Sequence, residues 1–134
     1  MTHVLDTNII TAILKGNDKV KRKAQEALRE GKRIHINAIS YYEIKRGLLA
    51  ANATTQLKRF DEEICKKFGL ILLDSLDVLD CAAEIYSDLK KKSELIGDAD
   101  ILIAAMVSLR KFVLVTDDKD FDRIDGLRTE NWLN

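Results

Sequence analysis

The chain contains no proline, only six glycines and only two cysteines in 134 residues. The lack of proline and the scarcity of glycine exclude a flexible linker and a fibrous or disordered composition. Two cysteines cannot form a disulfide framework, which favours a thiol-containing cytosolic protein. No apolar run approaches the roughly 20 residues of a membrane span, and the start MTHVLDTN reaches an acidic residue too early for a signal peptide. We therefore expect a cytoplasmic protein without a membrane segment.

Hydrophobic residues make up 46% of the chain and charged residues 33%, which is typical of one globular domain spanning residues 1–134. The formal net charge is zero, because 22 basic residues balance 22 acidic ones. This balance hides a split. Residues 1–67 carry 14 basic and 8 acidic side chains, a balance of +6, and residues 68–134 carry 8 basic and 14 acidic ones, a balance of −6. Such asymmetry indicates either a charged binding face or merely solvated surface.

Short apolar segments alternate with segments of helical periodicity. We expect strands over 3–5, 33–36, 70–73, 112–115 and 128–130. We expect helices over 7–15, 18–30, 77–91 and 98–109, with Asp18 as the cap of the second. A further helix is expected to start from Ser40 as its cap, with a helical hairpin partner across 54–68. The runs 70–73 and 112–115 are typical of strands buried on both faces, and the helix 98–109 is apolar nearly all round and should lie in the core. This alternation predicts an α/β fold, a parallel sheet of four to five short strands with helices on both faces.

Polar residues follow two of these strands directly. Asp6 comes after the first strand, and Thr116, Asp117 and Asp118 come after the strand 112–115. In open parallel sheets the ligand crevice lies beyond the carboxyl ends of the strands. These residues should therefore open at the same edge of the sheet.

Four separate acidic positions can converge at that edge: Asp6, Glu43, Asp100 and Asp118. Each also has a simpler interpretation. Asp6 can cap the helix 7–15, Glu43 can be a surface glutamate, and Asp118 can belong to a solvated acidic turn with its neighbours Asp117 and Asp120. At the head of the apolar helix only one acid is needed as the cap, so we assign Asp98 to the cap and Asp100 to a ligand role.

A cluster of carboxylates without built-in cations predicts a divalent metal ion. Only Lys119 lies near the acids of TDDKDF, and crowded carboxylates raise one another's pKa unless an ion neutralises them. Oxygen ligands favour Mg²⁺, or Mn²⁺ as a substitute, over Zn²⁺. His3 and His35 show no metal-ligand spacing, and Cys65 and Cys81 are expected to fill core space. Acids that hold one or two such ions suit phosphodiester hydrolysis.

Four segments occur in order: LDTNI at the N-terminus, YEIKRGL about forty residues later, IGDADILIAA, and LVTDDKDF, with GLRTENW near the end. Their order and spacing resemble the PIN domain family and, within it, the VapC-type ribonuclease toxins of prokaryotic toxin–antitoxin pairs. The resemblance covers essentially the whole chain. It implies a three-layer α/β/α sandwich and an Mg²⁺-dependent endoribonuclease whose products carry a 5′-phosphate and a 3′-hydroxyl.

Carried over by position, the resemblance implies an acidic pocket of Asp6, Glu43, Asp100 and Asp118, with Asp6 and Asp100 as the principal metal ligands. It implies supporting roles for Thr7, Asn8, Thr116, Asp98 and Asp117, the first three orienting carboxylates or bound water. Many members of the group have Asn where this chain has Asp117 or Asp118. The identity of the fourth acid therefore stays open between Asp118, Asp117 and Asp120.

The resemblance also implies partners. RNA is expected over the basic half, with Lys45 and Arg46 as substrate-binding candidates and Lys21, Arg22 and Lys23 as weaker ones. A small antitoxin is expected to place a segment, often arginine-bearing, in the acidic pocket, and a homodimer is expected. The stretch Tyr41, Tyr42, Ile44, Leu48 and Leu49 is a candidate for the antitoxin groove or the dimer face, or for ordinary core packing.

Three alternatives remain at this point. The chain can be a housekeeping RNA-processing nuclease of the same family or a domain that only binds a basic partner. It can also be a non-catalytic, receiver-like domain that binds a metal ion and phosphate. Asp74 follows a strand, as a receiver domain requires, but the first strand supplies only Asp6. Asn8 likewise stands where a haloacid-dehalogenase-type phosphatase needs a second Asp.

Overall fold

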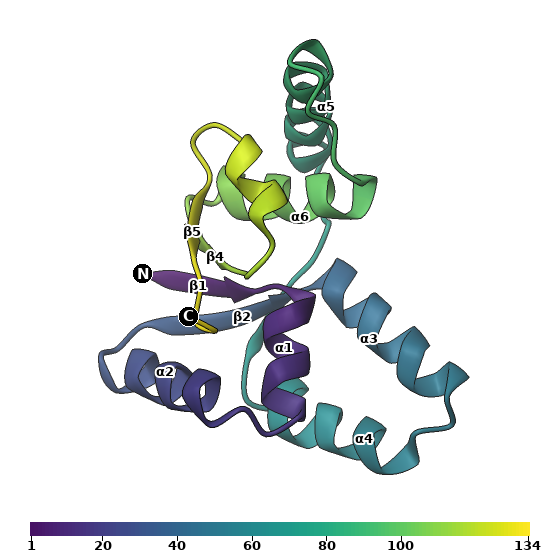
Figure 1. Cartoon of the computed structure of the whole chain (residues 1–134), viewed down its shortest axis with the longest axis vertical. Coiled ribbons are helices and arrows are strands. Elements are labelled where there is room, and N and C mark those ends of the chain that lie inside the picture. The colour runs from purple at the N-terminus through teal and green to yellow at the C-terminus, as the bar shows by residue number, and fades with distance from the viewer.

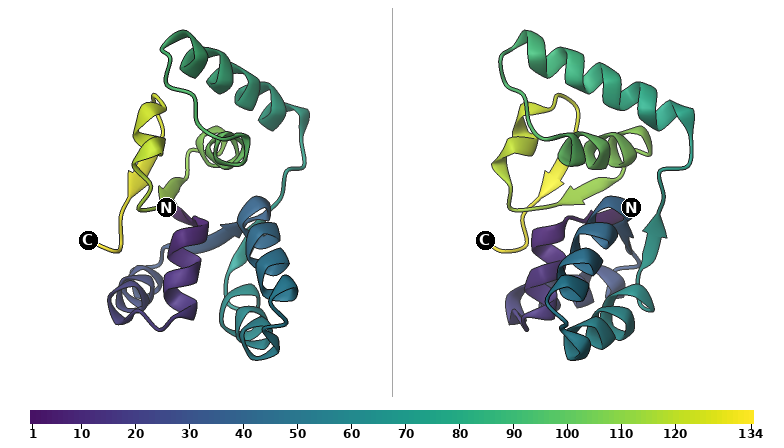
Figure 2. Two further views of the ribbon diagram at one scale, coloured as in Figure 1. Left: turned by 45° about the vertical axis from the view of Figure 1, so that its right-hand side comes forward. Right: turned by 90° about the vertical axis from the view of Figure 1, so that its right-hand side faces the viewer.

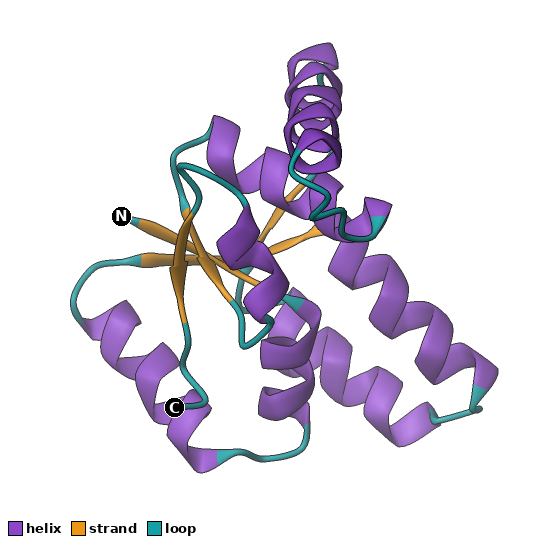
Figure 3. Ribbon diagram, turned by 45° about the horizontal axis from the view of Figure 1, so that its top comes forward, coloured by secondary structure: helices purple, strands orange, loops and turns teal.

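The computed structural model describes the whole chain, Met1–Asn134, around one five-stranded sheet (Figure 3). Its strands lie in the order β3-β2-β1-β4-β5, and every neighbouring pair is parallel. They are β1 (Thr2–Leu5), β2 (Arg33–Asn37), β3 (Gly69–Ile71), β4 (Val113–Val115) and β5 (Arg128–Glu130). The predicted parallel sheet is confirmed, and each predicted strand occurs within two residues of its expected bounds.

Helices cover both faces of this sheet (Figures 1 and 2). One face carries α1 (Thr7–Leu14), α2 (Asp18–Arg29), α3 (Ala38–Ala50), α4 (Thr54–Arg59) and the π-helix η1 (Phe60–Cys65). The other carries α5 (Leu76–Lys91) and α6 (Asp98–Leu109), and a short 3₁₀-helix η2 (Lys119–Arg123) precedes β5. The three-layer α/β architecture is thereby confirmed. No helix combines the length and the apolar character needed to cross a membrane.

Two hydrophobic clusters fill the space between the layers. Side chains of a strand alternate between the two faces, so Leu5 joins the cluster under α1 and α2 while Val4 joins the cluster under α5 and α6. Helix α6 contributes six buried side chains, from Ile101 to Val107. Its location in the core is what an apolar surface on nearly every side predicts. Helix α6 therefore holds its N-terminal residues in a fixed position against the sheet.

The expectation that residues 70–73 are buried on both faces is wrong. Strand β3 lies at the edge of the sheet, and Leu70 and Leu72 are 46% and 52% exposed. An edge strand has a neighbour on one side only, so an apolar run alone does not distinguish it from a central strand. The other run behaves as predicted, because β4 lies between β1 and β5 and its three residues are buried.

Two predicted helix caps are also displaced. Helix α2 is capped by Asn17, which accepts a hydrogen bond from the backbone N–H of Val20, and not by Asp18. Helix α3 begins at Ala38 and is capped by Asn37 instead of Ser40. Asparagine is as good a cap as aspartate or serine, and in both cases it stands just before the predicted residue.

Asn37 joins three elements through one buried side chain. Its amide group donates to the backbone oxygen of Leu5 at 3.1 Å and to the hydroxyl of Ser40 at 3.0 Å. Its carbonyl oxygen accepts the Ser40 backbone N–H at 2.8 Å. The side chain is completely buried, so water cannot replace these bonds. Asn37 thus ties the end of β1 to the end of β2 and the start of α3.

We predict that Asn37→Ala lowers the free energy of unfolding by about 2–3 kcal/mol, because it leaves the Leu5 carbonyl and the Ser40 N–H buried without partners. Asn17→Ala is the control, since it removes a helix cap that is not buried and should cost about 1 kcal/mol. Urea denaturation followed by circular dichroism measures both changes. Equal losses in the two variants would contradict a joining role for Asn37.

Candidate active site

Asp6 lies at the carboxyl end of β1, the central strand, and its side chain is almost fully buried at 4% exposure. One carboxylate oxygen accepts the backbone N–H of Thr7 at 2.8 Å, so Asp6 caps α1, as one sequence interpretation predicts. The other oxygen accepts the Thr116 hydroxyl at 2.8 Å and the Asn8 amide at 3.3 Å. Burial raises the pKa of Asp6, and these hydrogen bonds offset only part of that effect.

Thr116 connects Asp6 to the acidic turn that follows β4. Its hydroxyl oxygen accepts the backbone N–H of Asp118 at 3.1 Å, while Asn8 accepts the backbone N–H of Asp117 at 3.4 Å. Asn8 also donates to the Thr116 hydroxyl at 3.4 Å. The ends of β1 and β4 are therefore linked by side-chain hydrogen bonds, and the positions predicted to orient carboxylates do contact them.

Glu43 is held in the site by a chain of hydroxyl groups. The Thr7 hydroxyl lies 2.9 Å from the Glu43 carboxylate and 2.9 Å from the Ser40 hydroxyl. An ionised carboxylate only accepts, so the single Thr7 proton goes to Glu43, and Ser40 donates to Thr7 while accepting from Asn37. Glu43 is thus a positioned group and not a free surface glutamate. Sequence patterns did not predict that Ser40 and Asn37 support the Thr7–Glu43 hydrogen bond. The Asn-x-x-Ser spacing after a strand is a capping signal that could have indicated the contact between Asn37 and Ser40.

Asp100 lies in the first turn of α6 and is half-buried. Its pKa is raised to about 6, first by burial and then by repulsion from Asp6, Asp118 and Glu43. Repulsion from Asp118 and Glu43 also contributes to the raised pKa of Asp6. None of the seven ion pairs in the structure includes any of these four acids. The structure therefore brings the four predicted acids close enough to repel one another and provides no cation to balance them.

Among the rivals for the fourth position, Asp118 fits better than Asp120. Asp120 forms an ion pair with Arg123 at 3.3 Å, and of the four neighbouring acids it repels Asp100 least. Asp118 forms no ion pair, and its carboxylate caps η2 by accepting the backbone N–H of Asp120 at 2.9 Å. The third rival, Asp117, is exposed.

Asp98 does not cap α6. The capping position is Gly97, no side chain accepts a hydrogen bond there, and Asp98 is exposed at the start of the first turn. Glycine is tolerated at this position because it leaves the first N–H groups open to solvent. Asp98 still adds favourable negative charge near the positive end of the helix.

The donor set at this edge suits a hard divalent cation, because every candidate ligand is an oxygen atom. The structure contains no group of three Asp, Glu, His or Cys side chains at mutual distances that would hold an ion. The four carboxylates are thus neighbours that repel one another without forming a closed coordination sphere. A cation between them would remove both the repulsion and the cost of burying Asp6.

The predicted basic residues lie in two places. Lys45 and Arg46 are exposed on α3; Lys45 donates to the Tyr41 hydroxyl at 3.3 Å, and the Arg46 guanidinium lies 5.1 Å from the centre of the Tyr42 ring. Lys21, Arg22 and Lys23 lie on α2, which packs against α1 and β2 and carries none of the four acids. Only the cations of α3 belong to an element of the acidic site.

The apolar stretch on α3 is divided between core and surface. Ile44 belongs to the cluster under α1 and α2, and Tyr41 and Leu48 pack against it. Tyr42 and Leu49 are 59% and 55% exposed. The first three side chains are therefore unavailable as a continuous docking groove.

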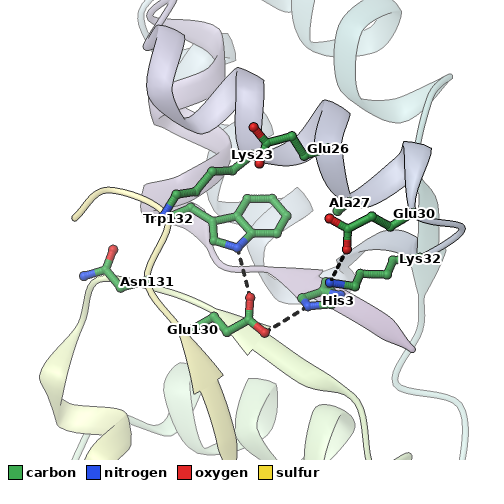
Figure 4. Close-up of a pocket in the computed structure, with 9 residues that line it drawn as sticks. All are labelled: His3, Lys23, Glu26, Ala27, Glu30, Lys32, Glu130, Asn131 and Trp132. Carbon is green, nitrogen blue, oxygen red and sulfur yellow. Dashed lines mark hydrogen bonds and ion pairs between the residues drawn. The ribbon is translucent and has the colours of Figure 1, made fainter.

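A separate cavity of about 370 Å³ lies between α2 and the C-terminal residues (Figure 4). Glu130 accepts hydrogen bonds there from the Trp132 indole and from His3, both at 3.1 Å. Burial alone would raise the pKa of Glu130, but these two hydrogen bonds, together with the charges of His3 and Lys32, lower it. None of the four acids lines this cavity, and its hydrogen bonds attach the C-terminal segment to β1.

The raised pKa of Asp100 predicts a pH-dependent cost in stability. The folded protein disfavours the charged carboxylate, so Asp100 contributes stability below its unfolded pKa near 3.8 and loses that contribution as the pH rises through about 6. In EDTA at about pH 8, Asp100→Asn should raise the free energy of unfolding by about 1 kcal/mol, a value reduced for solvent screening because the side chain is partly exposed. Urea denaturation measures the gain.

Asp98→Asn is the matched control for this variant, because Asp98 is exposed in the same helical turn. The gain from Asp100→Asn should disappear at about pH 4, where the carboxyl group is largely protonated in the folded protein. A gain that is independent of pH, or an equal gain from Asp98→Asn, would be incompatible with this explanation.

Comparison with known proteins identifies the family of the chain. The model of the family described as PIN domain matches residues 3–127. The chain is 31% identical over 141 residues to Ribonuclease VapC2 of Rickettsia felis and 27% identical over 133 residues to Ribonuclease VapC1 of Haemophilus influenzae; each alignment covers 98% of this chain and of the relative. The crystal structure of VapBC2 from Rickettsia felis bound to a DNA fragment from their promoter superposes with a TM-score of 0.84 at 27% identity, covering 98% of this chain and 99% of that chain. The chain belongs to the PIN domain family and, within it, to the VapC group of ribonucleases.

Proposed function

We propose that this protein is an Mg²⁺-dependent endoribonuclease and the toxin of a VapBC-like toxin–antitoxin pair. The observation that carries the proposal is the group of four carboxylates at the carboxyl edge of the sheet, which no cation of the protein balances. A group of unpaired carboxylates lowers the stability of the fold. Such a group can bind the divalent ions that catalyse phosphodiester hydrolysis. Mn²⁺ offers the same preference for oxygen ligands and is expected to substitute.

Asp6 and Asp100 are the proposed principal ligands, because burial and neighbouring acids raise the pKa values of both carboxyl groups and a bound cation would remove that cost. Bound Mg²⁺ supplies positive charge for the reacting phosphate and lowers the pKa of a coordinated water. Thr116 and Asn8 orient the Asp6 carboxylate, and Thr7 orients Glu43. Glu43 and Asp118 assist as further ligands or through water.

The zero net charge of the chain does not oppose an RNA substrate. It describes the metal-free protein, in which the four carboxylates contribute their full negative charge. Divalent cations at the site cancel part of that charge, and the exposed cations Lys45 and Arg46 stand on the same helix as Glu43. A polyanion therefore meets a more positive surface when the site is loaded.

An antitoxin is the proposed protein partner, since the Rickettsia felis structure contains a VapBC pair. A second copy of the chain is a further proposed partner. Four exposed leucines lie on or just after the edge strand β3 and on the first turns of α5: Leu70, Leu72, Leu76 and Leu79. An unpaired sheet edge with an apolar surface favours association with another chain. Sedimentation velocity decides this point, because a protein that stays monomeric at high concentration would exclude the homodimer.

Two of the three alternative functions, the receiver-like domain and the housekeeping nuclease, have less support than the toxin. Asp74, which a receiver-like domain would use, is exposed and forms an ion pair with Arg110 at 3.2 Å, outside the acidic site. A housekeeping RNA-processing role uses the same site chemistry. Membership of the VapC group favours the toxin over that role.

We expect EDTA to abolish RNA cleavage and Mg²⁺ or Mn²⁺ to restore it. Asp6→Asn and Asp100→Asn should each lower kcat/KM at least about 100-fold, because each removes a ligand charge while preserving shape. Cleavage of total cellular RNA and of short single-stranded RNA measures the loss, and circular dichroism checks the fold.

Asp98→Asn and Asp117→Asn are the controls, since both residues are exposed neighbours of the proposed ligands. They should retain activity within a few-fold of the unmodified protein. Full cleavage by well-folded Asp6→Asn and Asp100→Asn proteins would refute the assignment of the site.

A further inference from the structure

Tyr42 and Arg46 form an exposed pair beside the acidic site. Tyr42 is 59% exposed, the largest exposure of any aromatic side chain that the structure leaves on its surface. The Arg46 guanidinium lies over its ring, 5.1 Å from the ring centre. Arg46 forms no ion pair with any carboxylate. An exposed aromatic ring that packs on a free cation is not explained by the hydrophobic core.

The packing of α3 shows which way this pair faces. Tyr41 lies against Phe60 on one side of the helix, with ring centres 5.6 Å apart. Ile39 packs on the opposite side, against the cluster under α5 and α6. Tyr42 and Arg46 follow Ile39 by three and seven residues, so helical periodicity places them on that same side.

This side of α3 is the side of the acids. Glu43 is the next residue after Tyr42, and helix α3 contacts α6, whose first turn carries Asp100. The Tyr42–Arg46 pair therefore lies on the side of α3 that carries Glu43 and that turns toward α6, whose first turn carries Asp100. An RNA strand bound at Glu43 on this side of α3 lies next to the Tyr42 ring.

We infer that Tyr42 stacks on an unpaired nucleobase of the RNA next to the cleaved phosphodiester, and that Arg46 supports the ring and contacts a neighbouring phosphate. Arg46 covers one face of the ring, which leaves the other for a base. Stacking on an aromatic side chain requires a base that is not paired in a duplex. The inference rests on the proposed function and adds to it a residue that binds one base at a defined position next to the cleaved bond.

An abasic scan tests this inference. A short single-stranded RNA that the protein cleaves at one bond is synthesised as a set, each member lacking the base at one position around that bond. For the unmodified protein, loss of one particular base should raise KM about ten-fold, within the range that base–aromatic stacking contributes, with little change in kcat. Tyr42→Ala should raise KM for the intact RNA by the same factor and should show no further loss with that abasic RNA. Tyr42→Trp should restore the difference in KM between the intact RNA and the RNA that lacks this base.

Tyr86→Ala is the matched control. Tyr86 is also exposed and also carries a cation four residues later, Lys90 at 5.9 Å from its ring centre, but it lies on α5. This variant should leave KM unchanged for every RNA of the set. A Tyr42→Ala protein whose KM is unchanged, or whose loss is equal for intact and abasic RNA, would overturn the inference, and the second result would indicate a protein-binding or structural role for the ring.

The same scan separates this inference from the proposed function. Fluorescence anisotropy measures binding of the RNA set to Asp6→Asn, which is expected to be inactive, and to Asp6→Asn with Tyr42→Ala. Base-dependent binding that requires Tyr42, together with undiminished cleavage by Asp6→Asn, would support the stacking role and refute the catalytic assignment. Metal-dependent cleavage that is lost in Asp6→Asn but unchanged in Tyr42→Ala would support the catalytic assignment and refute the stacking role.

Discussion

Mutual repulsion among buried or half-buried carboxylates is the constraint around which this structure is arranged. Burial raises the pKa values of Asp6 and Asp100, and repulsion from the nearby Asp118 and Glu43, without a balancing cation, raises them further. These acids come from four separated segments, and only a parallel sheet with its strand ends at one edge brings them together. The fold thus creates an electrostatic cost at one place, and a divalent ion is the simplest means of removing it.

The scaffold around the acids is built to tolerate that repulsion. Neutral donors hold the carboxylates in place: Thr116 and Asn8 on Asp6, and Thr7 on Glu43. Asn37 secures the support behind Thr7 through Ser40. Neutral donors fix the position of a carboxylate without cancelling its charge, which an arginine or lysine would do. The negative potential at this edge therefore remains available to a metal ion.

Sequence patterns predicted the order of elements and the parallel sheet, because hydrophobic periodicity and the position of a residue after a strand are local properties. The choice of Asp6, Glu43, Asp100 and Asp118 depended on the resemblance to the PIN domain family, since the spacing of Glu43 alone is equally typical of a surface residue. They did not predict which strand lies at the sheet edge, since the exposure of Leu70 depends on the absence of a neighbouring strand. They placed the caps of α2 and α3 on Asp18 and Ser40, because several polar residues compete at a helix start and local geometry decides among them. The hydrogen bond from Thr7 to Glu43 joins residues 36 positions apart, and no short-range pattern records it.

The protonation of the Asp100 carboxyl group reports directly on whether these carboxylates form an uncompensated metal site. Its pKa can be followed by carbon-13 NMR of the labelled protein, in EDTA and again with Mg²⁺. We expect a pKa of about 6 without metal, and a clear decrease when Mg²⁺ is present because the ion favours the charged carboxylate. A pKa near the ordinary value of 3.8 in EDTA, or one that Mg²⁺ leaves unchanged, would contradict the claim that these carboxylates form an uncompensated metal site.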